Sequence, residues 1–313
     1  MAASPLNPKA LFRHTRSVSL PSRSNPLTIR VEEQLHTLRS SAEATTSSTS
    51  PSFIFHCLCG LKDLFERVDD LLRLPLVQTT LANERSDKKC VNEVLNGSLR
   101  MLDVCGTTTD VLSQMKQCVQ DLQSSLRRRR RVGNEFGLAN EFGSYMFSRK
   151  KLNKVIRKCL EDLKRMNNNT PILAGKNHEV VVAIVGVLRE VEAVTLSMFG
   201  SILVFLDGSK SQSKPRGWSL VSKLMHTKHV ASIEGEDSAD DIHEVEKTLS
   251  ALISTNRSSD QKLCKDNERV RVQNALKRFE AFESNIQELE EGLACVSRCL
   301  IKNRVSILNS LNH

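Results

Sequence analysis

Pairs of cysteines and histidines come closest, in type and spacing, to a metal site. Three such pairs occur: Cys57 with Cys59, Cys295 with Cys299, and His226 with His229. A structural zinc ion needs four ligands that converge on one point, often from C-x-x-C pairs, and this sequence has no C-x-x-C. The nine cysteines also lack the spacing of a disulfide framework. We therefore predict reduced thiols, no metal and no cofactor.

Residues for catalysis are equally sparse. The sequence contains no glycine-rich phosphate loop, no G-x-S-x-G motif and no H-E-x-x-H motif. Glu190 and Glu192 are two residues apart, so a helix would turn them to different faces. His56 and His178 stand alone, and we interpret them as structural or exposed. We predict a protein that is not an enzyme and has no catalytic residues, with an undescribed enzyme of small-molecule metabolism as the third-ranked alternative.

Positive charge is concentrated in one segment, residues 127–158. It carries eleven basic residues and only two acidic ones, whereas the whole chain has a net charge of +9. Aromatic residues are interleaved with the basic ones. The candidate contact residues for a partner or a lipid are Arg127, Arg128, Arg129, Arg130, Arg131, Phe136, Phe142, Tyr145, Phe147, Arg149, Lys150 and Lys151.

Four interpretations of this basic segment remain open. The five arginines are typical of a solvated helix end, where cations oppose the negative end of the macrodipole. Basic residues among aromatic rings also suit an anionic membrane surface, where rings insert and charges meet headgroups. An acidic protein partner is the third interpretation. Nucleic acid is disfavoured, because no recognition module surrounds the run.

A second candidate contact is the stretch RSVSLP. Arg16 precedes Ser19 by three residues, and Pro21 follows it by two. Phosphorylated Ser19 would suit the basic groove of a 14-3-3 protein, with Arg16 serving kinase recognition and Pro21 turning the chain out of the groove. The alternative is that RSVSLP matches by chance, because Ser/Arg/Pro-rich tails often contain such sequences.

The same tail bears on location. It is basic, rich in serine and free of acidic residues before Glu32, as organelle presequences are. We predict a cytoplasmic protein, peripheral to a membrane if the basic segment binds lipid. A plastid location through a cleaved N-terminal segment is the alternative.

The elements that position these residues are predicted to be long helices. Aromatic residues make up 4% of the chain, and only 13 glycines and 8 prolines occur. Heptad patterns run from about residue 88 to 130 and through the last 40 or so residues. We favour packing within one bundle over a free coiled coil. Residues 177–206 form the most apolar segment, which we place at the bundle centre.

The domain organisation follows from these patterns. We predict an all-α fold, a bundle of long antiparallel helices preceded by a disordered tail. The divisions are a basic Ser/Arg/Pro-rich tail over 1–24, a short helix over 25–39 capped by Asn25, a Ser/Thr-rich linker over 40–52, and a single helical domain over 53–311 with surface loops at 132–143 and 207–241.

Long linear blocks of the sequence closely resemble the plant-specific BYPASS-like family. The blocks include GLKDLFERVDDLLRLPLVQ, EVLNGSLRMLDVCGTTTDVLSQMKQCVQDLQSSLRRR, SRKKLNKVIRKCL, VLREVEAVTLSMFGSIL and ELEEGLACVSRCLIKNRVSILN. With RSVSLPSRSNPL and VEEQLHTLRSS, they follow family order and cover most of the chain from Arg16 to Asn309.

The resemblance implies a role in root and shoot development and an all-helical fold, and it supplies no catalytic residue. It also implies that the arginine run belongs to a recurring LQSSLRRR helix end. We therefore predict a non-enzymatic regulatory or scaffold protein of plant development that acts through protein contacts. The alternative is a peripheral membrane protein that binds anionic lipid through residues 127–158.

Overall fold

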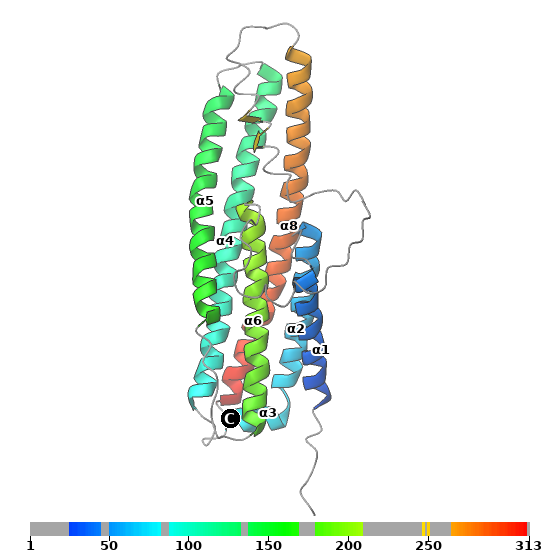
Figure 1. Cartoon of the computed structure of the whole chain (residues 1–313), viewed down its shortest axis with the longest axis vertical. Helices are drawn as coiled ribbons and strands as arrows, with labels where there is room; N and C mark the ends of the chain where they lie inside the picture. Colours follow the sequence, from blue (N-terminus) through cyan, green and yellow to red (C-terminus); the bar gives the residue numbers. More distant parts are fainter. Residues whose placement is uncertain are drawn as a thin grey trace, which may run out of the picture.

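The computed structural model describes residues 25–44, 50–82, 88–132, 137–168, 179–208, 246–247, 249–250 and 264–311. The long elements in these ranges are all helices, and they confirm the predicted all-α fold (Figure 1). They are α1 (Pro26–Ala44), α2 (Pro51–Leu72), α3 (Pro75–Ala82), α4 (Lys88–Val132), α5 (Gly137–Asn168), α6 (Glu179–Asp207) and α8 (Cys264–Leu311). The N-terminal segment 1–24 lies outside the described residues, as does most of the excursion 207–241.

The first two helices begin at side-chain caps. The Asn25 side chain accepts a hydrogen bond from the backbone N–H of Leu27 at 2.9 Å, which confirms Asn25 as a cap. Ser50 accepts one from the N–H of Phe53 at 3.2 Å, and Pro51 occupies the first helical position. Because Ser50 and Pro51 form this start, α2 begins inside the segment predicted as a linker.

Two other boundaries also differ from the prediction. Helix α1 continues to Ala44, past the predicted end at residue 39. Helix α5 begins at Gly137, whereas residues 132–143 were predicted to be a loop because of their glycines. Burial of Phe142 and Tyr145, whose rings stack with centroids 6.1 Å apart, outweighs the roughly 1 kcal/mol that a helical glycine costs. The short helix α3 was not predicted.

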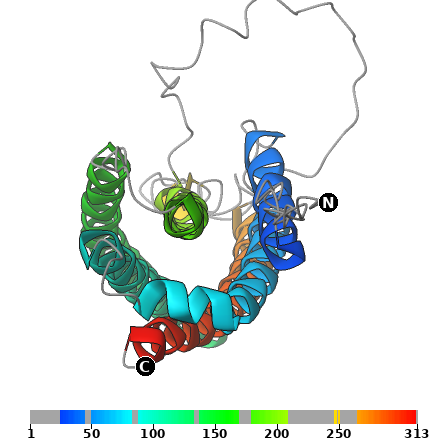
Figure 2. The same cartoon turned by 90° about the horizontal axis from the view of Figure 1, so that it is seen from below.

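The long helices form an arc around α6. Seen from the end of the bundle, α5, α4, α8, α2 and α1 follow one another along the arc, and α6 lies on its concave side (Figure 2). Helix α6 packs on α1, α2, α3, α4 and α5. The most apolar helix is therefore central, as predicted. Helix α5 ends the arc, and among the described helices it packs on α4 and α6.

Helices α4 and α8 run antiparallel in a fixed register. The polar pairs that cross between them include Lys116 with Glu290 at 3.0 Å, Gln120 with Glu283 at 2.6 Å, and Arg127 with Glu280 at 2.9 Å. Along these pairs the residue number increases in α4 and decreases in α8, as expected for antiparallel helices. The polar seam residues Ser98 and Thr108 donate to carbonyl oxygens of their own helix, each at 2.8 Å, so they fit the buried seam without unpaired hydroxyls.

Candidate interaction surface

Helix α5 is amphipathic along its whole packed length. One side of it is buried against α4 and α6 at intervals of three and four residues, namely Phe142, Tyr145, Arg149, Leu152, Ile156, Cys159 and Leu163. The opposite side has no described helix over it. The 3.6-residue period therefore divides the predicted basic-aromatic segment into a buried half and an exposed half.

The exposed half forms what we call the α5 basic face: Phe147, Lys150, Lys151, Lys154 and Lys158. All five side chains are exposed, and Phe147 is 61% exposed. The Lys151 ammonium lies 4.5 Å from the centroid of the Phe147 ring, a cation–π contact. No acidic residue occurs between positions 142 and 160. This face therefore combines four positive charges with one exposed aromatic ring.

The four lysines of the α5 basic face make no ion pair with any described residue. Other charged groups do form ion pairs: Asp69 binds Arg73 and Lys302 at 2.9 and 3.0 Å, and Glu192 binds Arg100 at 2.7 Å. Neighbouring lysines without local acids raise the electrostatic potential over the surface they share. Such a potential favours contact with anionic groups.

The start of the arginine run has a structural role. Arg127 pairs with Glu280 of α8 at 2.9 Å, and Arg128 donates to the Ser125 hydroxyl at 2.9 Å and lies 3.7 Å from Glu141 of α5. These exposed pairs are each worth about 1 kcal/mol or less. They nevertheless direct the two guanidinium groups toward neighbouring helices. The side chains of residues 129–131 and of Phe136 lie outside the described part of the chain.

Three predicted contact residues are buried and so lie outside the contact surface. Phe142, Tyr145 and Arg149 are at most 8% exposed. The Arg149 guanidinium donates to the carbonyl oxygen of Leu206 at 2.5 Å and lies 3.4 Å from the Glu246 carboxylate. The Tyr145 hydroxyl donates to the same carboxylate at 2.8 Å. Burial, followed by the negative charge of Glu246, raises the pKa of Tyr145 well above its ordinary value.

An open groove of about 330 Å³ runs between α5 and α6. Leu160, Leu163 and Lys164 line its α5 side. Its α6 side is made mainly of small residues: Ala193, Ser197, Gly200 and Ser201, with Leu196 and Val204. A Cβ atom built on Gly200 would meet only a Leu163 methyl group, at 3.7 Å. Small side chains at this spacing let another backbone approach a helix closely.

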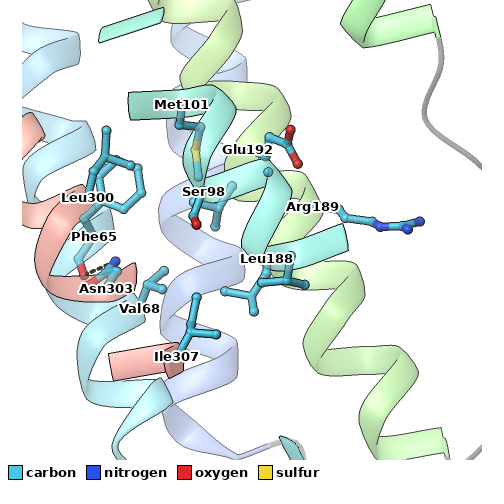
Figure 3. Close-up of a pocket in the computed structure, with 13 residues that line it drawn as sticks. Phe65, Val68, Ser98, Met101, Leu188, Arg189, Glu192, Leu300, Asn303 and Ile307 are labelled. Atoms are coloured by element: carbon cyan, nitrogen blue, oxygen red, sulfur yellow. Dashed lines mark hydrogen bonds between the residues drawn. The ribbon is translucent and has the colours of Figure 1, made fainter. Parts of the chain in front are cut away.

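A second hollow lies inside the bundle, where α2, α4, α6 and α8 meet (Figure 3). It holds only about 30 Å³ and is mostly apolar, with Asn303 and Ser98 among its lining residues. The Asn303 amide donates to the carbonyl oxygen of Phe65 at 3.1 Å, while its own oxygen has no hydrogen-bond partner among the described residues. A water molecule fits such a space, whereas pockets for organic ligands begin near 300 Å³.

The remaining predicted sites are partly outside the described residues. Arg16, Ser19 and Pro21 lie there, and so do His226 and His229. Within the described ranges, no group of three or more His, Cys, Asp or Glu side chains is placed to hold a metal ion. Burial raises the pKa of both the Cys57 and the Cys105 thiols to about 11. No described helix is long and apolar enough to cross a bilayer.

Comparison with known protein families gives a match. The family model described as Protein BPS1 matches residues 57–309, which run from α2 to the end of α8 and include the α5 basic face. Searches of curated proteins and of solved structures found no match. The matched range covers well over half of the chain, and it agrees with the resemblance seen in the linear sequence blocks. The chain thus belongs to the BPS1, or BYPASS-like, family, and this membership supports a role in plant development.

Proposed function

We propose that this protein is a non-enzymatic regulatory or scaffold protein of root and shoot development, and that it binds an acidic surface of a protein partner through the α5 basic face. The observation that carries this proposal is the group of four lysines that follow the exposed Phe147 on α5 and make no ion pair with the described part of the chain. Complementary charge steers such a partner and sets its orientation. The exposed Phe147 ring at the N-terminal end of the face supplies apolar contact area.

The bundle holds this face in one geometry. Leu152 and Ile156 anchor α5 in the core, and Arg149 ties it to the end of α6. The lysines from 150 to 158 therefore span a fixed distance of about 12 Å along the helix axis. A preorganised charge pattern costs less conformational entropy on binding than a flexible basic tail does.

The neighbouring groove supports a protein partner over a lipid surface. Its α5 side is lined by Leu160, Leu163 and Lys164, in the two turns of the helix that follow Lys158. An amphipathic helix with an acidic flank could place its apolar side in this groove and its acidic flank toward Lys164, six residues after Lys158. A flat bilayer would contact the outer lysines and leave the groove unfilled.

Genetic complementation tests the proposal. The lysines at 150, 151, 154 and 158 are replaced by glutamine, and the variant is expressed in a plant that lacks the endogenous protein. A matched control replaces the same number of charges elsewhere, at Arg30, Arg67, Arg271 and Lys277. Circular dichroism and thermal unfolding verify that both variants fold. We expect the control to restore root and shoot growth and the α5 variant to fail; equal rescue by both would overturn the proposal.

The alternative function, peripheral binding to anionic lipid, is favoured by the 61% exposure of Phe147 beside Lys151. Co-sedimentation with phosphatidylcholine vesicles, with and without phosphatidylserine, tests it. Lipid binding predicts sedimentation only with phosphatidylserine, loss of it at high salt, and loss in Phe147→Ser as well as in the lysine variant. Sedimentation that does not depend on phosphatidylserine or on these residues rejects the alternative.

Docking of phosphorylated Ser19 to a 14-3-3 protein remains a further proposal, carried by the RSVSLP sequence. Phosphopeptide mapping of the protein isolated from plant tissue tests the modification. Fluorescence anisotropy with a 14-3-3 protein then compares the phosphorylated and unmodified tail peptides. Absence of phosphate on Ser19 in the tissue, or equal affinity of the two peptides, rejects this docking.

A further inference from the structure

The described chain breaks off after α6 and resumes at Glu246, and both ends of this break lie beside Arg149. Leu206, at the end of α6, accepts a hydrogen bond from the Arg149 guanidinium at 2.5 Å. Glu246, where the described chain resumes, lies 3.4 Å from the same guanidinium and also accepts from Tyr145. Leu249 is fully buried just beyond it. The segment between residues 209 and 245 is therefore tethered at both ends next to α5.

The part of this segment nearest to Glu246 is strongly acidic. Residues 234–244 read EGEDSADDIHE and contain six acidic residues and no lysine or arginine. The α5 basic face carries four lysines over nine residues of helix and has no described acidic partner. The two stretches thus carry charges of opposite sign, six acidic groups against four lysines.

The tether brings the two stretches within reach of each other. Asp241 is five residues from Glu246, a reach of up to about 17 Å, and Glu234 is twelve residues away, a reach of up to about 40 Å. The lysines of the basic face lie within about 14 Å of Arg149 along the α5 axis. A short tether of this kind gives a local concentration of about a millimolar.

We propose that residues 234–241 of this chain occupy the α5 basic face in the free protein and that an acidic partner must displace them. The inference rests on the proposed function, because it names the regulation of the same surface. The intramolecular contact reduces the apparent affinity for any external acidic ligand. Binding to the partner then becomes a competition between two acidic segments for one set of lysines.

Zero-length cross-linking of the full-length protein with a carbodiimide tests the contact directly. The reagent joins a lysine amine to a carboxylate only where the two groups touch. We expect cross-linked peptides that join the lysines at 150, 151, 154 or 158 to residues 234–241, with a yield that falls as salt rises. The Lys116–Glu290 pair, at 3.0 Å, is an internal positive control.

The cross-linking result has two outcomes that overturn the proposal. One is a cross-link at Lys116–Glu290 without any between the basic face and the acidic segment. The other is seen when isotopically labelled and unlabelled protein are mixed: cross-links that join a labelled chain to an unlabelled one would show that a second copy is the occupant. Neither outcome depends on an external partner, so failure of the complementation experiment leaves this test intact.

A binding measurement tests the competition. The probe is a fluorescein-labelled peptide of residues 232–243, added to the wild type and to a variant in which Glu234, Glu236, Asp237, Asp240 and Asp241 are replaced by their amides. We expect the variant to bind the probe at least tenfold more tightly than the wild type. Replacing the four lysines in the variant should abolish binding. Equal affinity of the wild type and the variant would overturn the proposal.

Discussion

Arg149 on α5 and Leu206 on α6 are joined by a hydrogen bond of 2.5 Å from the guanidinium to a main-chain carbonyl. This carbonyl belongs to the last turn of α6, and carbonyls there have no N–H partner within the helix. The Arg149 side chain is 5% exposed, and its charge is balanced by Glu246. One buried side chain therefore completes a helix end, pairs with a carboxylate and joins two helices.

Removal of this arginine should destabilise the fold strongly. We expect Arg149→Met to lower the free energy of unfolding by about 3 kcal/mol, because the Glu246 carboxylate loses its cationic partner and the α6 terminus loses a donor. The control is Arg39→Met, which breaks the exposed Arg39–Glu190 pair and should cost less than about 1 kcal/mol. Urea unfolding measures both variants. Similar losses in the two would contradict the buried role.

The titration of Tyr145 should make stability fall at high pH. Its pKa is raised above the ordinary value of 10.0, so the folded state holds the phenolic proton more tightly than the unfolded state does. The stabilisation is therefore complete below about pH 10 and is lost as the pH rises above that value. Tyr145 is the only tyrosine in the chain, so the tyrosinate absorbance reports it alone.

We expect tyrosinate absorbance in the native protein to appear only well above pH 10, and at ordinary pH in urea. In Tyr145→Phe, the free energy of unfolding should depend less steeply on pH above 10 than in the wild type. An ordinary tyrosinate titration in the folded protein would contradict the burial of this hydroxyl.

Alkylation should distinguish two cysteines that are two residues apart. Cys59 is exposed, whereas Cys57 is 2% exposed and its pKa is raised to about 11. At pH 8 roughly one Cys57 thiol in a thousand is ionised, and the thiolate is the reactive form. Brief iodoacetamide treatment followed by mass spectrometry should label Cys59 and leave Cys57 and Cys105 unlabelled. Equal labelling of Cys57 and Cys59 would show that α2 does not pack as described.

Two glycine substitutions should change stability in opposite directions. A Cβ atom at Gly292 of α8 would lie 2.9 Å from Leu58 Cδ1 and 3.2 Å from Leu58 Cβ, so Gly292→Ala should push α2 and α8 apart. At Gly106 of α4 a Cβ atom would meet nothing within 4 Å. Gly106→Ala should raise stability by about 1 kcal/mol through helix propensity alone. Thermal unfolding gives the sign of each change, and a lower melting temperature in Gly106→Ala would be inconsistent with this open position.

The fold was predictable where the hydrophobic period is long and unbroken. The seams of α4 and α8 repeat over many turns, and Asn25 marks the start of α1 by its side-chain chemistry. The hydrophobic period does not predict a helix boundary where packing outweighs the local preference of the residues. Gly143 lies within α5, and the neighbouring Phe142 and Tyr145 are nevertheless buried, so burial decides the start of this helix.

The candidate surface was predicted as a linear segment, but the structure organises it by helix face. Arg149 is four residues after Tyr145 and three before Leu152, so the spacing alone places it on the buried side. This spacing was available in the sequence, and it separates the buried Arg149 from the exposed Lys150 and Lys151. The pairing of Arg127 with Glu280 was not available, because the two residues are 153 positions apart and only the packing of α4 on α8 sets their register.

The position of α8 also governs how the chain can fold during synthesis. Helices α2, α3 and α4 all pack against α8, which is the last described helix to leave the ribosome. At roughly 5–20 residues per second, the apolar faces of these helices wait about ten seconds or more for their partner, and chaperones have access to them meanwhile. A nonsense mutation before Cys264 would leave those faces uncovered for good. Such an allele would yield a substrate for protein quality control rather than a shortened protein with partial activity.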